Sequence, residues 1–125
     1  MKTLVTGSNG LIGSQCVKFF SEKGEVIGID NDMRSYFFGE ESSTKSIGED
    51  LKNKIQNFTQ YDIDIRDRDA INNLFQQHNF DLIIHTAAQP SHDWASKEPI
   101  TDFEVNALGT INLLESYRTY SPNAV

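Results

Sequence analysis

The chain has little of several residue types that mark specialised proteins. Cys16 is the only cysteine, so no disulfide can form within the chain and a reducing cytoplasm is the simplest setting. No apolar run reaches the roughly 18 residues of a membrane span. The N-terminus runs straight into a strand-like segment, which leaves no signal peptide in front of it. We therefore expect a cytoplasmic protein without a membrane partner.

Basic residues are also scarce. Eleven Lys and Arg stand against eighteen Asp and Glu, and the net charge of −7 argues against a nucleic-acid partner. His78 and His85 form no set with carboxylates at metal-ligand spacing, so no metal site is expected. A chain of 125 residues is long enough for one hydrophobic core and too short for two ordinary domains.

The most informative feature that the sequence does have is a glycine turn between two apolar segments. Residues 1–5 lead into Thr6-Gly7-Ser8-Asn9-Gly10-Leu11-Ile12-Gly13, an amphipathic stretch follows to about residue 23, and residues 25–30 end on an acid. Strand, glycine turn, helix, strand and acid form the arrangement with which a parallel sheet holds a dinucleotide. The glycines would let a pyrophosphate approach the helix start, and Asp30 would accept hydrogen bonds from the adenosine ribose.

The spacing of these glycines leaves an alternative open. Gly7, Gly10 and Gly13 lie three apart, whereas the best-known dinucleotide fingerprint has its first two glycines two apart. An ordinary strand-to-helix turn is the alternative, and an acid about 20 residues downstream of the glycines weakens it. A Walker-type phosphate loop is excluded because no Gly-Lys-Ser/Thr closes the turn.

Strand-like and helical segments alternate along the whole chain. Further strands are predicted near residues 55–63 and 81–86, a long connection over 31–54, and helices after Asp67 and from about Pro99. The continuous apolar run at 81–86 suits a central strand covered on both faces. This alternation predicts a Rossmann-type α/β fold with a doubly wound parallel sheet, truncated before its fifth strand.

Two helices carry apolar residues at helical spacing, which predicts their buried faces. In the first helix these are Ile12, Cys16, Phe19 and Phe20, and in the helix from Pro99 they are Ile100, Phe103, Ala107, Ile111 and Leu114. Ligands of such sheets bind outside the carboxyl ends of the strands. The candidate ligand segments are therefore residues 6–13, 30–34, 64–65 and 86–94.

Five motifs along the chain carry a family resemblance: residues 6–13, 30–31, Asp64-Ile65-Arg66-Asp67, His85-Thr86-Ala87-Ala88-Gln89, and residues 105–115. In this order and spacing they resemble the extended short-chain dehydrogenase/reductase family, in particular its sugar-nucleotide epimerases and dehydratases. The resemblance spans nearly the whole chain. Within the family, residues 30–34 and 87–91 look most like the branch of the CDP-paratose 2-epimerases, also called tyvelose epimerases.

The resemblance implies NAD as the cofactor and a role for each matching position. Asp30 would bind the adenosine ribose, with Asn31 and Arg34 beside it. An arginine in this place can meet the 2′-phosphate of NADP, but the Asp30 carboxylate would repel that phosphate, so NAD is favoured. The pyrophosphate would be held by the turn residues Gly7, Asn9, Gly10, Leu11, Ile12 and Gly13.

The remaining implied roles concern the two ends of the cofactor. Asp64 would accept from the exocyclic amine of the adenine, and Ile65 would pack on the ring. Asn106 would support the active-site geometry from the long helix. A plain turn at Asp64 and a solvated helix residue at Asn106 are the alternatives. The segment that would run towards the nicotinamide ribose is Ala87, Ala88 and Gln89.

The sequence departs from the family pattern in two places. Leu11 stands where the family commonly has Phe. The family's catalytic apparatus is a Ser or Thr followed by Tyr-x-x-x-Lys, and no tyrosine here has a lysine four positions on. No catalytic residue is therefore predicted. We expect residues 1–125 to be the N-terminal part of an NAD-binding Rossmann domain, with the catalytic segment and the substrate lobe absent.

The resemblance thus implies the NAD-binding portion of a nucleotide-sugar epimerase that works by transient hydride transfer on a substrate such as CDP-paratose. The full-length parent would be a homo-oligomer, and this chain alone would be inactive. A dehydratase or reductase of the same family, and a non-catalytic NAD(P)-binding sensor module, remain alternatives. His92, Asp93 and Trp94 follow the fourth strand at the ligand edge, where they form either a substrate contact or a solvated loop.

Overall fold

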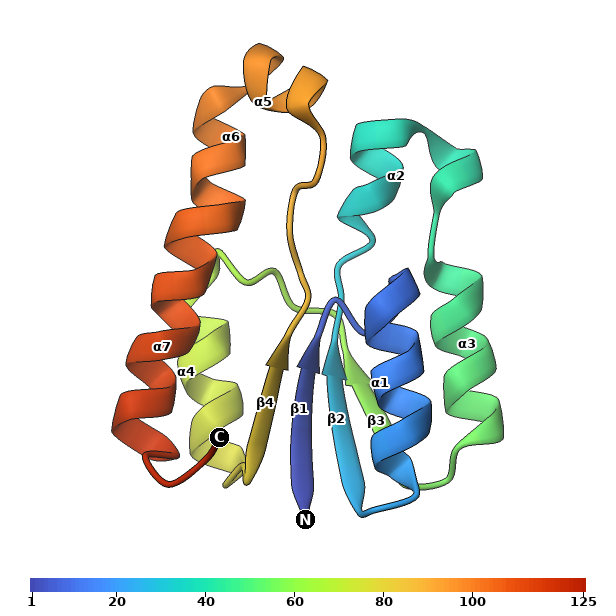
Figure 1. Ribbon diagram of the computed structural model, residues 1–125, viewed down its shortest axis with the longest axis vertical. Coiled ribbons are helices and arrows are strands. Elements are labelled where there is room, and N and C mark those ends of the chain that lie inside the picture. The colour runs from blue at the N-terminus through green and yellow to red at the C-terminus, as the bar shows by residue number, and fades with distance from the viewer.

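The computed structural model describes residues 1–125 and builds them around one parallel sheet. The strands are β1 (Lys2–Thr6), β2 (Glu25–Ile29), β3 (Phe58–Tyr61) and β4 (Leu82–His85). Their order is β3-β2-β1-β4, and every neighbouring pair is parallel. All four arrows of Figure 1 accordingly point the same way, with their carboxyl ends at the top of the view.

Helices cover both faces of this sheet. On one face lie α1 (Leu11–Ser21) and α3 (Lys45–Lys54), and on the other lie α4 (Arg68–Gln77) and α7 (Gly109–Tyr120). Successive strand residues point to opposite faces. Leu4 of β1 therefore packs with α4 and α7, while its neighbour Val5 packs with α1 and α3. The doubly wound parallel α/β fold predicted from the sequence is confirmed.

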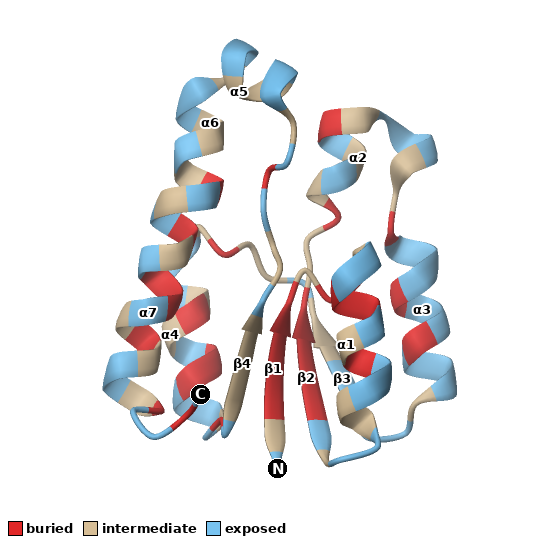
Figure 2. Cartoon of the chain, in the orientation of Figure 1, coloured by how far each residue is buried: buried red, intermediate tan, exposed pale blue.

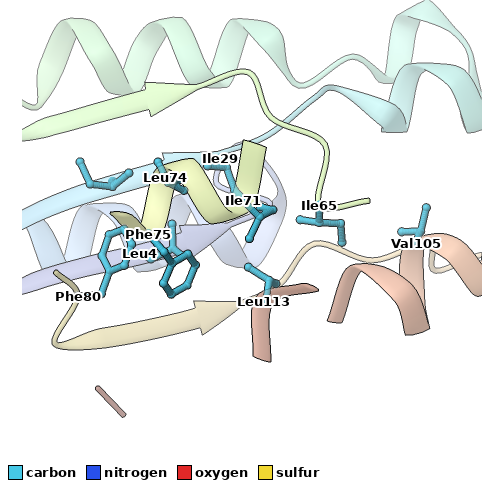
Figure 3. Packing of buried hydrophobic residues seen from close by; sticks show 10 residues of the cluster. Leu4, Ile29, Ile65, Ile71, Leu74, Phe75, Phe80, Val105 and Leu113 are labelled. Atoms are coloured by element: carbon cyan, nitrogen blue, oxygen red, sulfur yellow. The ribbon is translucent and has the colours of Figure 1, made fainter. Parts of the chain in front are cut away.

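The larger of the two cores lies between the sheet and the α4–α7 pair. Figure 3 shows Ile71, Leu74 and Phe75 of α4 facing strand residues, with Leu113 of α7 beside them. Phe75 and Phe80 meet edge to face, with ring centroids 5.1 Å apart. Asp67 caps α4, because its side chain accepts the backbone N–H of Ala70 at 3.0 Å, as the sequence predicted.

The segment 31–54, predicted as one long connection, instead contains three helical elements. They are α2 (Met33–Phe38), the 3₁₀ turn η1 (Glu40–Ser42) and α3. Asp32 organises this segment, since its buried carboxylate accepts from the backbone N–H of Thr44 at 2.7 Å and from the Ser43 hydroxyl at 2.8 Å. These hydrogen bonds tie the start of α2 to the start of α3. The prediction of one long connection was wrong because a polar side chain organises this segment, and apolar periodicity in the sequence does not reveal such a contact.

After β4 the chain forms a short helix and then one long helical rod. The short helix is α5 (His92–Lys97), capped by Ser91, and it replaces the loop considered for residues 91–94. The rod consists of α6 (Pro99–Phe103), the π-helical turn η2 (Glu104–Leu108) and α7. In Figure 1, α5 and α6 stand well above the sheet, on the opposite side from α2.

The face of the α6–α7 rod that was predicted as buried is exposed. Ile100 is 70% exposed and Phe103 62%, and Ile111 and Leu114 also face solvent. The buried residues of the rod are Val105, Gly109, Asn112, Leu113 and Ser116. Two of these are polar and form hydrogen bonds within the protein. The Asn112 amide donates to two backbone carbonyls, and the Ser116 hydroxyl donates to Asn72. The prediction was wrong because small and polar residues form the inner face.

The predicted face of α1 is wrong in part for the same reason. Ile12 and Phe19 are more than half exposed, whereas the small residues Gly13 and Ser14 are buried together with Val17. Cys16 and Phe20 do pack against the core, as predicted. Close packing of α1 on the turn before it requires small residues, so size rather than hydrophobicity selects the inner face.

β4 is the last strand of the sheet and not a central one. Its residues are only half-buried or exposed, while most of β1 and β2 is fully buried, as the colouring in Figure 2 shows. Val125 already pairs with its outer edge, because Ile83 N–H donates to the Val125 carbonyl at 2.8 Å and Val125 N–H donates to Asp81 at 3.0 Å. No helix of the chain has both the length and the apolar character needed to cross a bilayer.

Candidate functional site

The turn between β1 and α1 is closed so tightly that two of its glycines cannot carry a side chain. Gly7 has φ +66°, and a Cβ there would lie 2.8 Å from the backbone nitrogen of Ala87. A Cβ on Gly13 would overlap the Gly7 carbonyl and lie 2.8 Å from its carbon. The turn is held by Gly10 N–H, which donates to Gly7 O at 3.0 Å, and by Gly7 N–H, which donates to Ile29 O at 2.8 Å.

This packing leaves the first amides of α1 open. Gly10 is the N-cap and offers no side chain, so it satisfies none of the helix's free N–H groups. The backbone N–H groups of Leu11, Ile12 and Gly13 make no hydrogen bond within the chain. Together with the positive end of the helix dipole, three such amides offer the hydrogen-bond donors that an anion such as a pyrophosphate requires.

Asp30 lies just after β2, beside this turn. Its two carboxylate oxygens accept one backbone N–H each, from Asn9 at 3.0 Å and from Asp32 at 2.9 Å. Burial raises the pKa of the Asp30 carboxyl above its ordinary value, although these two hydrogen bonds act in the opposite direction. Each oxygen keeps a lone pair with which it can accept a hydroxyl group.

Asp64 follows β3 and is held mainly by Arg66. The Arg66 guanidinium reaches the carboxylate with its Nη2 at 2.6 Å, and Asn31 donates from its side-chain amide at 3.0 Å. Burial alone would raise the pKa of Asp64, but the hydrogen bonds from Arg66 outweigh it and the pKa lies below its ordinary value. The carboxylate is therefore charged and fixed in place at the edge of the site.

These segments meet in a cleft of about 400 Å³ at the carboxyl edge of the sheet. β2 and β4 lie on opposite sides of β1, so the segments that follow these two strands run to opposite sides of the cleft. Parallel sheets of this type bind their ligands at this position. Most of the residues selected from the sequence line it: Gly7, Gly10, Leu11, Ile12, Gly13, Asp30, Asn31, Arg34, Asp64, Ile65, Ala87 and Ala88.

Asn9, Gln89 and Asn106 do not line the cleft. The Asn9 side chain is buried beneath α3, close to Gly48, and only its backbone reaches Asp30. Gln89 and Asn106 bind each other instead: Gln89 N–H donates to Asn106 Oδ1 at 2.9 Å, and the Asn106 amide donates to Gln89 O at 3.0 Å. The pair fixes the chain after β4 against the π-helical turn of the rod.

Asp102 completes this pair, and the sequence reasoning missed it. Its Oδ1 accepts the side-chain amide of Gln89 at 2.8 Å and that of Asn106 at 3.0 Å. Asp102 precedes Asn106 by four residues, so both lie on one face of the helical rod. That spacing was the available signal, since a carboxylate one turn before an amide can orient it.

His85 at the end of β4 is fixed from both sides. Thr6 Oγ1 accepts the N–H groups of Thr86 and Ala87, so its own proton goes to His85 Nδ1, 2.7 Å away. The other ring nitrogen then carries the proton and donates to the Thr110 hydroxyl at 3.1 Å. Partial burial lowers the pKa of His85, which agrees with a neutral ring. The side chain thus joins the end of β1 to α7 rather than filling the core.

The outer wall of the cleft includes two residues outside the candidate segments, Phe37 and Phe38, and one inside them, Pro90. Phe37 and Phe38 of α2 line it from one side, and Pro90 lines it from the other. The Arg34 guanidinium lies over the Phe38 ring, 5.0 Å from its centroid. His92, Asp93 and Trp94 do not line the cleft; Trp94 packs on Phe37 from outside, with ring centroids 5.6 Å apart. No group of three or more His, Cys, Asp or Glu side chains is placed to hold a metal ion.

The chain belongs to the family whose model it matches over residues 3–125, the NAD dependent epimerase/dehydratase family. UDP-glucose 4-epimerase of Mus musculus is 32% identical over 121 residues, which cover 95% of this chain and 34% of that protein. CDP-paratose 2-epimerase of Salmonella typhi is 32% identical over 124 residues, or 98% of this chain and 34% of that protein. The family resemblance drawn from the five motifs is thereby confirmed.

Solved structures show the same relationship. The complex of Thermus thermophilus UDP-glucose 4-epimerase with NAD superposes with a TM-score of 0.75 and 32% identity, over 96% of this chain and 34% of that one. The chain thus spans about a third of the length of the relatives it matches. These relatives bear the names of epimerases of two nucleotide sugars, UDP-glucose and CDP-paratose.

Proposed function

We propose that residues 1–125 are the NAD-holding, N-terminal part of a nucleotide-sugar epimerase that works by transient hydride transfer. The single observation that carries this proposal is the set of free backbone amides at Leu11, Ile12 and Gly13, which open into the cleft. The proposal is supported by family membership and by the likeness to an epimerase solved with NAD.

The residues present fit an NAD molecule. The pyrophosphate would lie against the three free amides at the start of α1, which the tightly closed turn around Gly7 and Gly13 places at the edge of the cleft. Asp30 would accept the hydroxyls of the adenosine ribose with the lone pairs that its two backbone partners leave free. A 2′-phosphate would meet this carboxylate at close range, so NAD is favoured over NADP despite the neighbouring Arg34.

The two ends of the cofactor would lie on either side of the turn. Asp64 and Ile65 would border the adenine, with Asp64 held by Arg66 in the position to accept the exocyclic amine. Ala87 and Ala88 would allow close approach towards the nicotinamide ribose, because their side chains are small. Gln89, bound to Asn106, would fix that segment. When bound, NAD would supply the acceptor and donor of the transferred hydride.

This chain would orient the cofactor but not move the proton of the sugar. No tyrosine of the chain has a lysine four positions on, so a general base of that kind would come from the remainder of a longer protein. A dehydratase or reductase of the same family, and an NAD(P)-binding sensor, are the alternative functions. A longer protein with a Ser or Thr followed by Tyr-x-x-x-Lys favours the enzyme, and one without these residues favours the sensor.

CDP-paratose is the specific substrate we propose for the longer protein. Support comes from residues 30–34 and 87–91, and from the likeness to the Salmonella typhi enzyme. The mouse UDP-glucose 4-epimerase is equally similar, so the assay must compare CDP-linked and UDP-linked sugars at matched concentration. Faster conversion of a UDP-sugar than of CDP-paratose would overturn this choice of substrate.

Calorimetric titration with NAD and NADP tests the cofactor proposal directly. We expect NAD to bind the chain more tightly than NADP, and Asp30→Ala to weaken NAD binding by about tenfold to a hundredfold, the cost of losing a charged hydrogen-bond acceptor. Asp50→Ala is the matched control, because Asp50 is an exposed carboxylate that pairs with Lys54 on α3. Equal loss in both variants, or no NAD binding at all, would contradict the proposal.

We also propose that the protein acts as a homo-oligomer in the cytoplasm. The exposed apolar stripe of the α6–α7 rod, with Ile100, Phe103 and Ile111, supports self-association. Light scattering of the chain tests it: Phe103→Ser should shift the mass towards the monomer. A monomeric wild-type chain at high concentration would contradict the oligomer.

A further inference from the structure

Two short helices meet above the cleft although they come from opposite sides of it. α2 follows β2 and α5 follows β4, so their contact spans the crevice that the glycine turn opens. Trp94 of α5 donates its indole N–H to the backbone carbonyl of Phe37 in α2. Its ring lies 5.6 Å from that of Phe37 and 5.7 Å from that of Tyr36, centroid to centroid.

A second polar contact lies beside the first. The Tyr36 hydroxyl donates to the Glu98 carboxylate, with oxygen distances of 2.9 and 3.0 Å. Thr101 holds the same carboxylate by donating from its hydroxyl at 3.0 Å. We call the four residues Tyr36, Phe37, Trp94 and Glu98 the bridge.

The bridge lies directly on the wall of the cleft. Phe37 is 6% exposed, and it lines the cleft while its carbonyl and ring bind Trp94. Beneath it lie the glycine turn and Asp30, where the proposed cofactor would cross from one side to the other. A dinucleotide that crosses the cleft would therefore lie beneath the one place where the two sides of the crevice touch through the bridge.

The backbone on either side of α2 makes this helix the part of the bridge that would move. Asp32 before it has φ +53° and Gly39 after it has φ +91°, so the short helix lies between two left-handed residues. Among the regular elements it packs closely only against the adjacent η1 turn. Besides the anchor at Asp32 and the packing of Met33 on the main core, the contacts with Trp94 and Glu98 hold α2 over the cleft.

We propose that the bridge is a gate for the cofactor, which sets how fast an NAD-type dinucleotide enters and leaves. The inference rests on the proposed function and deepens it. In both polar contacts of the bridge the donor and the acceptor belong to the protein. Neither donor is therefore available for a hydrogen bond to the ligand. Breaking these contacts therefore lowers the barrier to entry and to exit alike and leaves the binding equilibrium nearly unchanged.

Stopped-flow kinetics with NADH test the gate. Association is followed by the fluorescence of NADH on mixing, and dissociation by displacement with excess NAD. Trp94→Phe keeps a ring but removes the N–H donor, and Tyr36→Phe removes only a hydroxyl from a residue that is 58% exposed. Each variant should raise both rate constants by about threefold to tenfold, the factor expected from the loss of one hydrogen bond that is partly open to solvent, with Kd changed less than about twofold.

Tyr120→Phe is the matched control, because it removes a hydroxyl that accepts from Gln76 on the far side of the molecule. Its rate constants should equal those of the wild-type chain. Unchanged rates in both bridge variants, or a rise in the dissociation rate alone with a weaker Kd, would overturn the gate while leaving the cofactor proposal intact. Absence of NADH binding to the wild-type chain would instead overturn the proposed function and the gate with it.

Discussion

Replacing Gly13 by alanine tests whether the turn is as tightly closed as the site requires. The new methyl group would overlap the carbonyl of Gly7 and lie 3.0 Å from Ser8 Cα, and both neighbours are backbone atoms that cannot rotate away. Overpacking of this kind costs about 1–3 kcal/mol. Alanine recovers part of this, since it favours a helix by about 0.5–1 kcal/mol over glycine. We expect a net loss of about 1–2 kcal/mol in the free energy of unfolding.

Gly10→Ala provides the comparison. Its methyl group would lie 3.2 Å from one atom, the Gly7 carbonyl oxygen, and Gly10 has φ −69°, which alanine adopts freely. We expect this variant to lose less than about 1 kcal/mol. Urea unfolding followed by circular dichroism measures both, with equal slopes required for the comparison. NAD binding should weaken at least tenfold in Gly13→Ala. Equal unfolding midpoints for the two variants would refute the account of the turn.

Two further predictions concern histidine ionisation and the pair at the π-helical turn. Partial burial lowers the pKa of His85 and of His78, so below about pH 6.5 the unfolded chain binds more protons than the folded chain. Stability should therefore fall as the pH drops below this value, and urea midpoints that stay flat between pH 7 and about pH 5 would contradict it. Asp102→Ala removes the acceptor shared by Gln89 and Asn106; amide exchange at Gln89 should quicken about tenfold, and unchanged exchange would contradict its anchoring role.

Local spacing in the sequence was sufficient to predict the turn and the carboxylates around the cleft. Gly7, Gly13 and Asp30 form one strand-turn-helix-strand unit, in which each residue's place follows from chain connectivity. Asp64 and Ala87 could be added because the carboxyl ends of parallel strands share one edge of the sheet. Their detailed contacts with a cofactor remain predictions.

Other features depend on contacts that no local pattern records. The inner face of the α6–α7 rod consists of small and polar residues such as Asn112, whose partners come from the distant β3–α4 connection. Apolar periodicity therefore selected the outer stripe instead. The bridge joins Phe37 to Trp94 across 57 positions of sequence, and Tyr36 to Glu98 across 62. Such contacts between residues far apart in the sequence form only when the fold brings the segments after β2 and β4 together.

We propose above all that this chain holds NAD with the backbone amides at the start of α1. At 14.1 kDa the chain suits amide-resolved NMR, in which NAD is titrated into labelled protein. We expect the largest shift changes at the backbone amides of Leu11, Ile12 and Gly13, followed by those around Asp30 and Ala87. Saturable changes confined to other surfaces, with the three α1 amides unmoved, would contradict it.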